Sequence, residues 1–137
     1  MAMNQYSMGP MAGQDVYRQN AAQTASPGQL TLMLYNGCLK FIKQGRQGIE
    51  GKDVQLKNEN LKKAQNIISE LMVTLKVEDE TTRNMLRLYD YIKHQLVQAN
   101  VHNSLEALDE AEKYVTQFRD TWKEVIQSER KRQHGQS

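Results

Sequence analysis

The sequence predicts an all-α protein, an antiparallel up-down four-helix bundle preceded by a flexible N-terminal arm. Both prolines lie within the first 27 residues, so none interrupts a helix in the remaining chain. In four later segments apolar residues recur at steps of three and four, the spacing that places them on one helix face. A chain of 137 residues leaves room for one domain, and no segment shows a competing strand pattern.

Residues 1–25 show neither a helical nor a strand period, and we predict that they form the flexible arm. They hold four of the seven methionines, and Asp15 and Arg18 are their only charged residues. This composition differs from that of a highly charged segment that solvates itself. The arm therefore carries apolar groups that can dock against another surface.

The first helix is predicted to begin with Ser26 as its N-cap and Pro27 at its first position, where a missing N–H costs nothing. The helix is expected to end near Gly51. Its glycines would each cost up to about 1 kcal/mol in a helix interior, which indicates close packing against another helix. The predicted buried stripe comprises Leu30, Met33, Leu34, Gly37, Phe41, Gly45, Gly48 and Ile49.

The second helix is predicted to be capped by Asp53 and carries the most regular apolar pattern in the chain. Ile67 and Met72 lie beside this pattern and widen the apolar face. Such a surplus is expected of a bundle helix that contacts two neighbours or a binding partner. The seven-residue seam itself consists of Leu61, Ala64, Ile68, Leu71 and Leu75.

Acidic residues at 78–80 suit the positive N-terminal end of a third helix, after which residues 100–103 are predicted to turn the chain. Asn103 or Ser104 can then cap a fourth helix that reaches Arg132. We therefore expect the bundle over residues 26–132 and a disordered C-terminal tail over 133–137. The apolar positions are Met85, Leu88, Tyr89, Ile92, Leu96 and Ala99 in the third helix and Leu108, Ala111, Val115, Phe118, Trp122 and Val125 in the fourth.

The charge balance does not indicate a polyanionic partner, because 18 basic and 16 acidic residues give a formal charge of only +2. A modest basic patch between Lys40 and Lys63 holds seven basic and three acidic residues. Phe41 is the only aromatic residue in this stretch, so the patch offers a single ring for nucleic-acid bases to stack on. Solubility explains the patch better, and we expect no nucleic-acid partner.

Cysteine usage and hydropathy predict a cytoplasmic protein without membrane insertion. The single cysteine, Cys38, cannot form an intramolecular disulfide, which fits a reducing compartment. No run approaches the roughly 20 apolar residues that a membrane span requires. The N-terminus also lacks the charged-then-apolar order of a signal peptide.

The reactive groups do not form a recognisable catalytic or metal-binding pattern. His94, His102 and His134 are scattered, and no Glu-x-x-His pair is present to build a di-iron site. The glycines near Lys52 do not match the phosphate-loop spacing. Cys38 has no evident base nearby. We therefore expect a protein that is not an enzyme and that uses neither a cofactor nor a metal.

Tyrosine placement hints at a binding surface. Tyr89 and Tyr91 cannot both face the core, because they lie two residues apart on one helix. A tyrosine ring with its hydroxyl suits a half-buried groove that accepts an amphipathic helix. A packed bundle surface explains the same pattern equally well, so both interpretations stay open.

Four blocks of this sequence resemble the family of flagellin export chaperones, FliS. The first is TASPGQLTLMLYNGCLKF at Thr24–Phe41, with the Ser-Pro helix start. The others are KAQNIISEL (63–71), LYDYIKHQLVQAN (88–100) and FRDTWKEVIQSER (118–130), in the family's order and spacing. The resemblance covers about residues 17–130.

The resemblance implies a cytoplasmic bundle that binds the disordered C-terminal region of flagellin, prevents its polymerisation and brings it to the flagellar export gate. It also implies that Tyr17 contacts the gate protein, although Gln14 stands where the family often has tyrosine or an apolar residue. An assembly regulator of flagellin is left open as a further partner. From pattern and resemblance together, the candidate flagellin-binding residues are Tyr35, Ile67, Leu71, Met72, Tyr89, Tyr91, Leu96 and Asn100.

Two alternatives remain at this point. One is a helical interaction module with a different client, and the other is a nucleic-acid-binding bundle that uses the basic patch at 40–63. Client identity separates the first alternative from a flagellin chaperone. Salt separates the second, because nucleic-acid affinity falls by orders of magnitude as salt rises.

Overall fold

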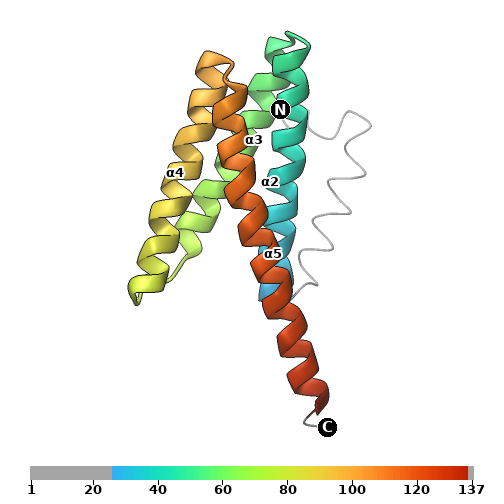
Figure 1. Cartoon of the computed structure of the whole chain (residues 1–137), viewed down its shortest axis with the longest axis vertical. Helices are drawn as coiled ribbons and strands as arrows, with labels where there is room; N and C mark the ends of the chain where they lie inside the picture. The colour runs from blue at the N-terminus through green and yellow to red at the C-terminus, as the bar shows by residue number, and fades with distance from the viewer. Residues whose placement is uncertain (1–25, 136–137) are drawn as a thin grey trace, which may run out of the picture.

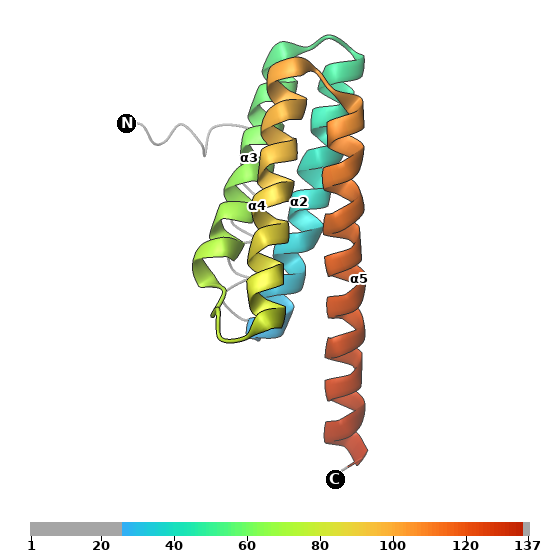
Figure 2. The same cartoon turned by 60° about the vertical axis from the view of Figure 1, so that its left-hand side comes forward.

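The computed structural model describes residues 26–135, which form four helices and no strand. The helices are α2 (Pro27–Glu50), α3 (Val54–Thr74), α4 (Glu80–His102) and α5 (Leu105–Gly135). Successive helices run in opposite directions, and α2 and α4 each pack against both α3 and α5 (Figures 1 and 2). The predicted all-α bundle is confirmed, whereas the predicted arm over 1–25 lies outside the described residues.

The first two helices begin where their capping residues predict. The Ser26 hydroxyl accepts a hydrogen bond from the Gln29 backbone N–H, and the Ser26 N–H donates to the Gln29 side chain. This reciprocal pair is a capping box, followed by Pro27 in the first turn. Asp53 caps α3 by accepting from the Leu56 N–H at 3.0 Å.

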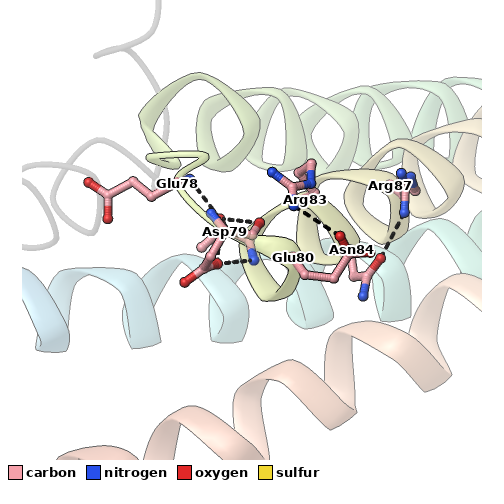
Figure 3. A network of polar contacts seen from close by, with 7 residues as sticks. Glu78, Asp79, Glu80, Arg83, Asn84 and Arg87 are labelled. Carbon is pink, nitrogen blue, oxygen red and sulfur yellow. Dashed lines mark hydrogen bonds and ion pairs between the residues drawn. The ribbon is translucent and has the colours of Figure 1, made fainter.

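The start of α4 is held by a dense network of side-chain contacts (Figure 3). Asp79 is the N-cap, and its carboxylate accepts from the Thr82 N–H at 2.8 Å while the Thr82 hydroxyl accepts from the Asp79 N–H. The hydrogen bonds that the Asp79 carboxylate accepts from the Thr82 N–H and from the Thr82 hydroxyl lower the pKa of this carboxyl. One turn further, Arg83 pairs with Glu80 at 3.0 Å. The network satisfies the backbone N–H groups at the start of α4.

The ends of α4 and α5 differ from the prediction. Residues 100–102 belong to α4, and the chain turns at Asn103, which adopts the left-handed conformation with φ 53° that asparagine tolerates. Ser104 is the cap of α5, since its hydroxyl accepts from the Ala107 N–H. No proline or glycine stops α5 before Gly135, so the helix continues past Arg132 and through part of the segment expected to be disordered.

The core is built from apolar helix faces, and the predicted seam of α3 lies in it or packs against it. In α2 the prediction was largely wrong, because the buried side chains are Tyr35, Cys38 and Ile42, which are not in the predicted stripe. The predicted positions Leu30 and Val125 are exposed.

Close helix packing at the glycines is confirmed between α2 and α3. A Cβ atom on Gly48 would overlap the Lys57 backbone, and one on Gly45 would overlap the Leu61 side chain. The fully buried set is Cys38, Ile42, Leu61, Ala64, Ile68, Ile92, Leu96, Ala99, Leu108, Ala111 and Val115.

Candidate binding groove

Four of the predicted binding residues are core residues. Tyr35, Leu71, Tyr89 and Leu96 are each at most 5% exposed. Their side chains lie between the helices and present almost no surface to a partner. Periodicity could not separate them from groove residues, because a residue below a groove and one lining it share the same helix face.

The other four predicted residues do not form a single site. Ile67 and Met72 lie partly buried on α3, where Ile67 packs against Gly37 of α2. The Asn100 side-chain amide donates to the Asn58 side-chain oxygen at 3.0 Å, on the α3–α4 side. Tyr91 is 38% exposed and faces α5 instead. Tyr17, the predicted gate contact, lies outside the described residues.

An apolar groove of about 340 Å³ opens between α4 and α5. The two helices are joined by a short turn at one end and move apart toward the other (Figures 1 and 2). The groove lies toward the end where they separate, against the first turns of α4. Its lining, which defines the α4–α5 groove, is Tyr35, Thr81, Met85, Leu88, Tyr114, Gln117, Phe118, Thr121, Trp122 and Val125.

Three aromatic rings pack beneath this groove. Phe118 stacks on Tyr35 with 5.7 Å between ring centroids, and its ring lies tilted against that of Tyr89 with 4.8 Å between centroids. The Tyr35 and Tyr89 hydroxyl oxygens lie 2.6 Å apart, within hydrogen-bond distance. Burial raises the pKa of both phenols, so neither ionises at neutral pH. The floor of the groove is therefore uncharged and largely apolar.

The apolar surface continues around α5 toward α2. A second pocket of about 370 Å³ lies between the first turn of α2 and α5, and Trp122 and Val125 line both pockets. The Trp122 indole N–H donates to the Gly28 carbonyl at 2.7 Å, which fixes the ring between the two pockets. Val125 is 41% exposed, and α5 extends here beyond the other three helices (Figures 1 and 2).

The opposite end of the α4–α5 seam is polar. A pocket of about 520 Å³ there is lined by Tyr91, Gln95, His102, Glu106 and Glu110, among others. The Tyr91 hydroxyl donates to Glu110 at 3.0 Å and accepts from the Gln95 side chain at 2.7 Å. One seam thus offers an apolar end and a polar, acidic end to anything that lies along it.

Sequence analysis missed most of the groove because its aromatic residues form part of a regular seam. Phe118, Trp122 and Val125 continue the core pattern of α5, so they were assigned to the core. The length of α5 relative to the other helices was the signal that could have indicated the groove. The seam runs to Val125, while α5 has 31 residues against 21 to 24 in the other helices, so its last turns lack partners within the bundle.

Several basic residues of the 40–63 patch contact other side chains of the protein. Arg46 pairs with Asp109 and Glu112 of α5 at 2.7 and 2.9 Å. The ammonium group of Lys57, itself largely buried, donates to the Asn103 side chain at 2.7 Å. Lys63 lies over the Phe41 ring at 5.5 Å. These contacts leave fewer free cations for a phosphate backbone than the sequence count indicates.

Among the described residues, no metal-binding cluster and no activated cysteine is present. They contain no group of three or more His, Cys, Asp or Glu side chains able to hold a metal ion. Burial raises the pKa of the Cys38 thiol to about 12, so it is not a nucleophile at neutral pH. No helix in the described part is long and apolar enough to cross a membrane. The fold and the groove define an all-α four-helix bundle with an apolar groove between α4 and α5.

Comparison with known proteins specifies this class further. The family model described as "Flagellar protein FliS" matches residues 10–129. The chain is 58% identical over 119 residues to the "Flagellar secretion chaperone FliS" of Bacillus subtilis (strain 168), covering 87% of this chain and 90% of the relative. For the protein of the same name from Escherichia coli (strain K12), the identity is 36%, with 80% and 83% covered. The chain therefore belongs to the FliS family of flagellar secretion chaperones.

Proposed function

We propose that this protein is a cytoplasmic, non-enzymatic chaperone that binds the disordered C-terminal segment of flagellin, prevents premature polymerisation and brings flagellin to the export gate. Family membership and the names of its relatives as flagellar secretion chaperones support the export role. The observation that carries the binding role is the open α4–α5 groove, with an apolar lining that suits an amphipathic helix.

Binding would couple to folding of the client. A disordered segment that lays apolar side chains into the groove becomes helical, at a cost of about 2–5 kcal/mol in ordering. Three fully buried Leu-sized side chains return roughly 5–9 kcal/mol, before the cost of association is counted. The groove alone is therefore too small for tight binding, and the client must cover further surface. Ile67 and Met72 on α3 are the proposed second contact, with Tyr91 and Asn100 as polar contacts.

The proposed contact with the export gate rests on Tyr17 and on the family resemblance. An assembly regulator of flagellin remains a proposed further partner. A helical module with a different client stays the alternative function, and client identity distinguishes it.

Titration calorimetry with the C-terminal segment of the cognate flagellin tests the proposal. Val125→Glu places a charge in the groove on an exposed side chain, so the bundle should stay folded while affinity falls at least about tenfold. Val101→Glu is the matched control, because Val101 is 64% exposed and lies outside the lining of the groove. Equal loss in both variants would remove the groove from the binding site. No binding by the unchanged protein would reject flagellin as the client.

A further inference from the structure

A further pocket, of about 320 Å³, lies at the end of the bundle that holds both the α2–α3 turn and the α4–α5 turn (Figures 1 and 2). It shares no lining residue with the α4–α5 groove, which lies toward the other end. Two of its lining residues are lysines and none is acidic. The lining, which defines the turn pocket, is Gly48, Ile49, Lys52, Val54, Lys57 and Asn103.

The side chain of Lys57 connects the two turns around this pocket. Lys57 is 8% exposed, and its backbone packs so closely on Gly48 that an added Cβ there would overlap it. From α3 its ammonium group reaches the α4–α5 turn, where it donates to the Asn103 side-chain oxygen at 2.7 Å. Because both partners of this hydrogen bond line the turn pocket, the ammonium group lies at the pocket. Lysine is rarely buried to this extent unless it is paired.

No acidic group in the described part of the chain pairs with the two lysines of the turn pocket. None of the ion pairs within residues 26–135 includes Lys52 or Lys57. Glu50 and Asp53 flank the turn in sequence, but neither lines the pocket, and the Asp53 carboxylate caps α3. The helix dipoles oppose one another here, because α2 and α4 end where α3 and α5 begin. A buried charge without a counter-charge is unfavourable, so an anion in the pocket would offset this cost.

The donors at the turn pocket favour a carboxylate over a phosphate. Phosphate sites in loops use several free backbone N–H groups. In this turn the Lys52 N–H already donates to the Ile49 carbonyl at 3.2 Å, and the Asp53 N–H donates to the Gly48 carbonyl at 2.8 Å. The remaining donors are ammonium groups, which act as point charges. Ile49 and Val54 supply the apolar part of the lining and suit a short aliphatic chain that carries the carboxylate.

We infer that the turn pocket binds a carboxylate group, with the ammonium groups of Lys57 and Lys52 as its donors. Lys57 is held in place by its burial and by Asn103. Lys52 adds the second charge from the turn, where its backbone has a φ of 55°. A pocket of about 320 Å³ admits a small aliphatic acid or an acidic side chain of a bound protein segment. The inference does not depend on the proposed function, because the site is separate from the groove.

Titration of the full chain with propionate at neutral pH and constant ionic strength tests the site, with NMR shifts as the readout. The amide signals of Lys52, Lys57 and Asn103 should shift saturably, with a Kd of about 1–10 mM for so small a ligand. Propionamide has the same shape without the charge and should cause no saturable shift at these signals. Equal shifts with both compounds, or no saturable shift below about 50 mM propionate, would overturn the inference.

Substitutions test whether the lysines provide the binding. Lys57→Met keeps the length of the side chain and removes its buried charge, so the variant should stay folded while propionate affinity falls at least about tenfold. Lys52→Gly removes the second cation, and glycine adopts a positive φ without strain, so affinity should fall about threefold to tenfold.

Lys62→Met is the matched control, because Lys62 is an exposed lysine of α3 outside the lining. It should bind propionate like the unchanged protein, and circular dichroism should show all three variants folded. Unreduced affinity in Lys52→Gly and in Lys57→Met would overturn the inference. If Lys57→Met does not fold, unreduced affinity in Lys52→Gly alone would overturn the assigned pair of donors.

The C-terminal flagellin segment distinguishes the two sources of the carboxylate. Each of its aspartates and glutamates is changed to the amide and measured against the unchanged protein and Lys57→Met. A change whose effect disappears in Lys57→Met places a carboxylate of the client in the turn pocket. Additive effects throughout, with propionate still bound, assign the pocket to a free carboxylic acid. Failure of the segment to bind overturns the proposed function alone, because the propionate titration uses no flagellin.

Discussion

At the scale of single residues, burial rather than residue type decides which groups can react. Cys38 is fully buried in the core, and its thiol lies 3.9 Å from the Ala64 carbonyl of α3. Its pKa is raised to about 12 by loss of solvation, so almost no thiolate exists at neutral pH. The sequence shows no evident base near Cys38, and burial gives a further physical reason why this thiol does not ionise.

The raised pKa values predict how stability depends on pH. An unfolded thiol ionises near 9.0 and the native one near 12, so between these values the unfolded state binds fewer protons. The free energy of unfolding should be level below about pH 8.5 and fall above pH 9 by up to about 1.4 kcal/mol per pH unit. Tyr35 and Tyr89 act in the same direction above about pH 10. Urea unfolding across pH 7–11 measures this, and Cys38→Ala should flatten the slope between 9 and 10. An unchanged slope would show that Cys38 does not cause it.

At the scale of elements, α2 and α3 pack closely where α2 has a glycine that no larger residue can replace. Gly48→Ala would force the backbones of α2 and α3 apart at Lys57, with a loss of about 1–3 kcal/mol or more. Gly37→Ala is the matched control, because its added Cβ would meet the Ile67 side chain at an ordinary 3.5 Å. There the gain in helix propensity should stabilise the protein by up to about 1 kcal/mol. Thermal unfolding compares them, and destabilisation of the same size in both would contradict this account.

The sequence predicted the helix starts well because each start depends on local chemistry. Ser26 and Asp53 act within four residues of their partners, so a single chain segment contains the whole signal. The predicted end of α4 was three residues too early, because the turn needs only Asn103 in the left-handed conformation. The α4–α5 groove was not predicted because it depends on residues far apart in the sequence. Whether Trp122 lies in the core or at the surface depends on where the neighbouring helices end.

At the scale of the whole molecule, near-neutral charge and an apolar groove predict how binding responds to salt and temperature. The formal charge is +2, and part of the basic patch is paired internally. Client binding should therefore change less than about threefold between 0.05 and 0.5 M NaCl, and its heat-capacity change should be large and negative. Binding through phosphates would instead weaken by orders of magnitude over this range.

Calorimetry at several temperatures and salt concentrations measures both quantities with the same flagellin segment. The variant Lys62→Gln with Lys63→Gln removes two exposed cations of the patch and should leave the affinity nearly unchanged. A steep salt dependence would contradict this prediction. If the double substitution also reduced that dependence, binding would be assigned to the basic patch and not to the α4–α5 groove. The alternative of a nucleic-acid-binding bundle would then gain support over a chaperone that binds through its groove, because the apolar surface would no longer explain the affinity.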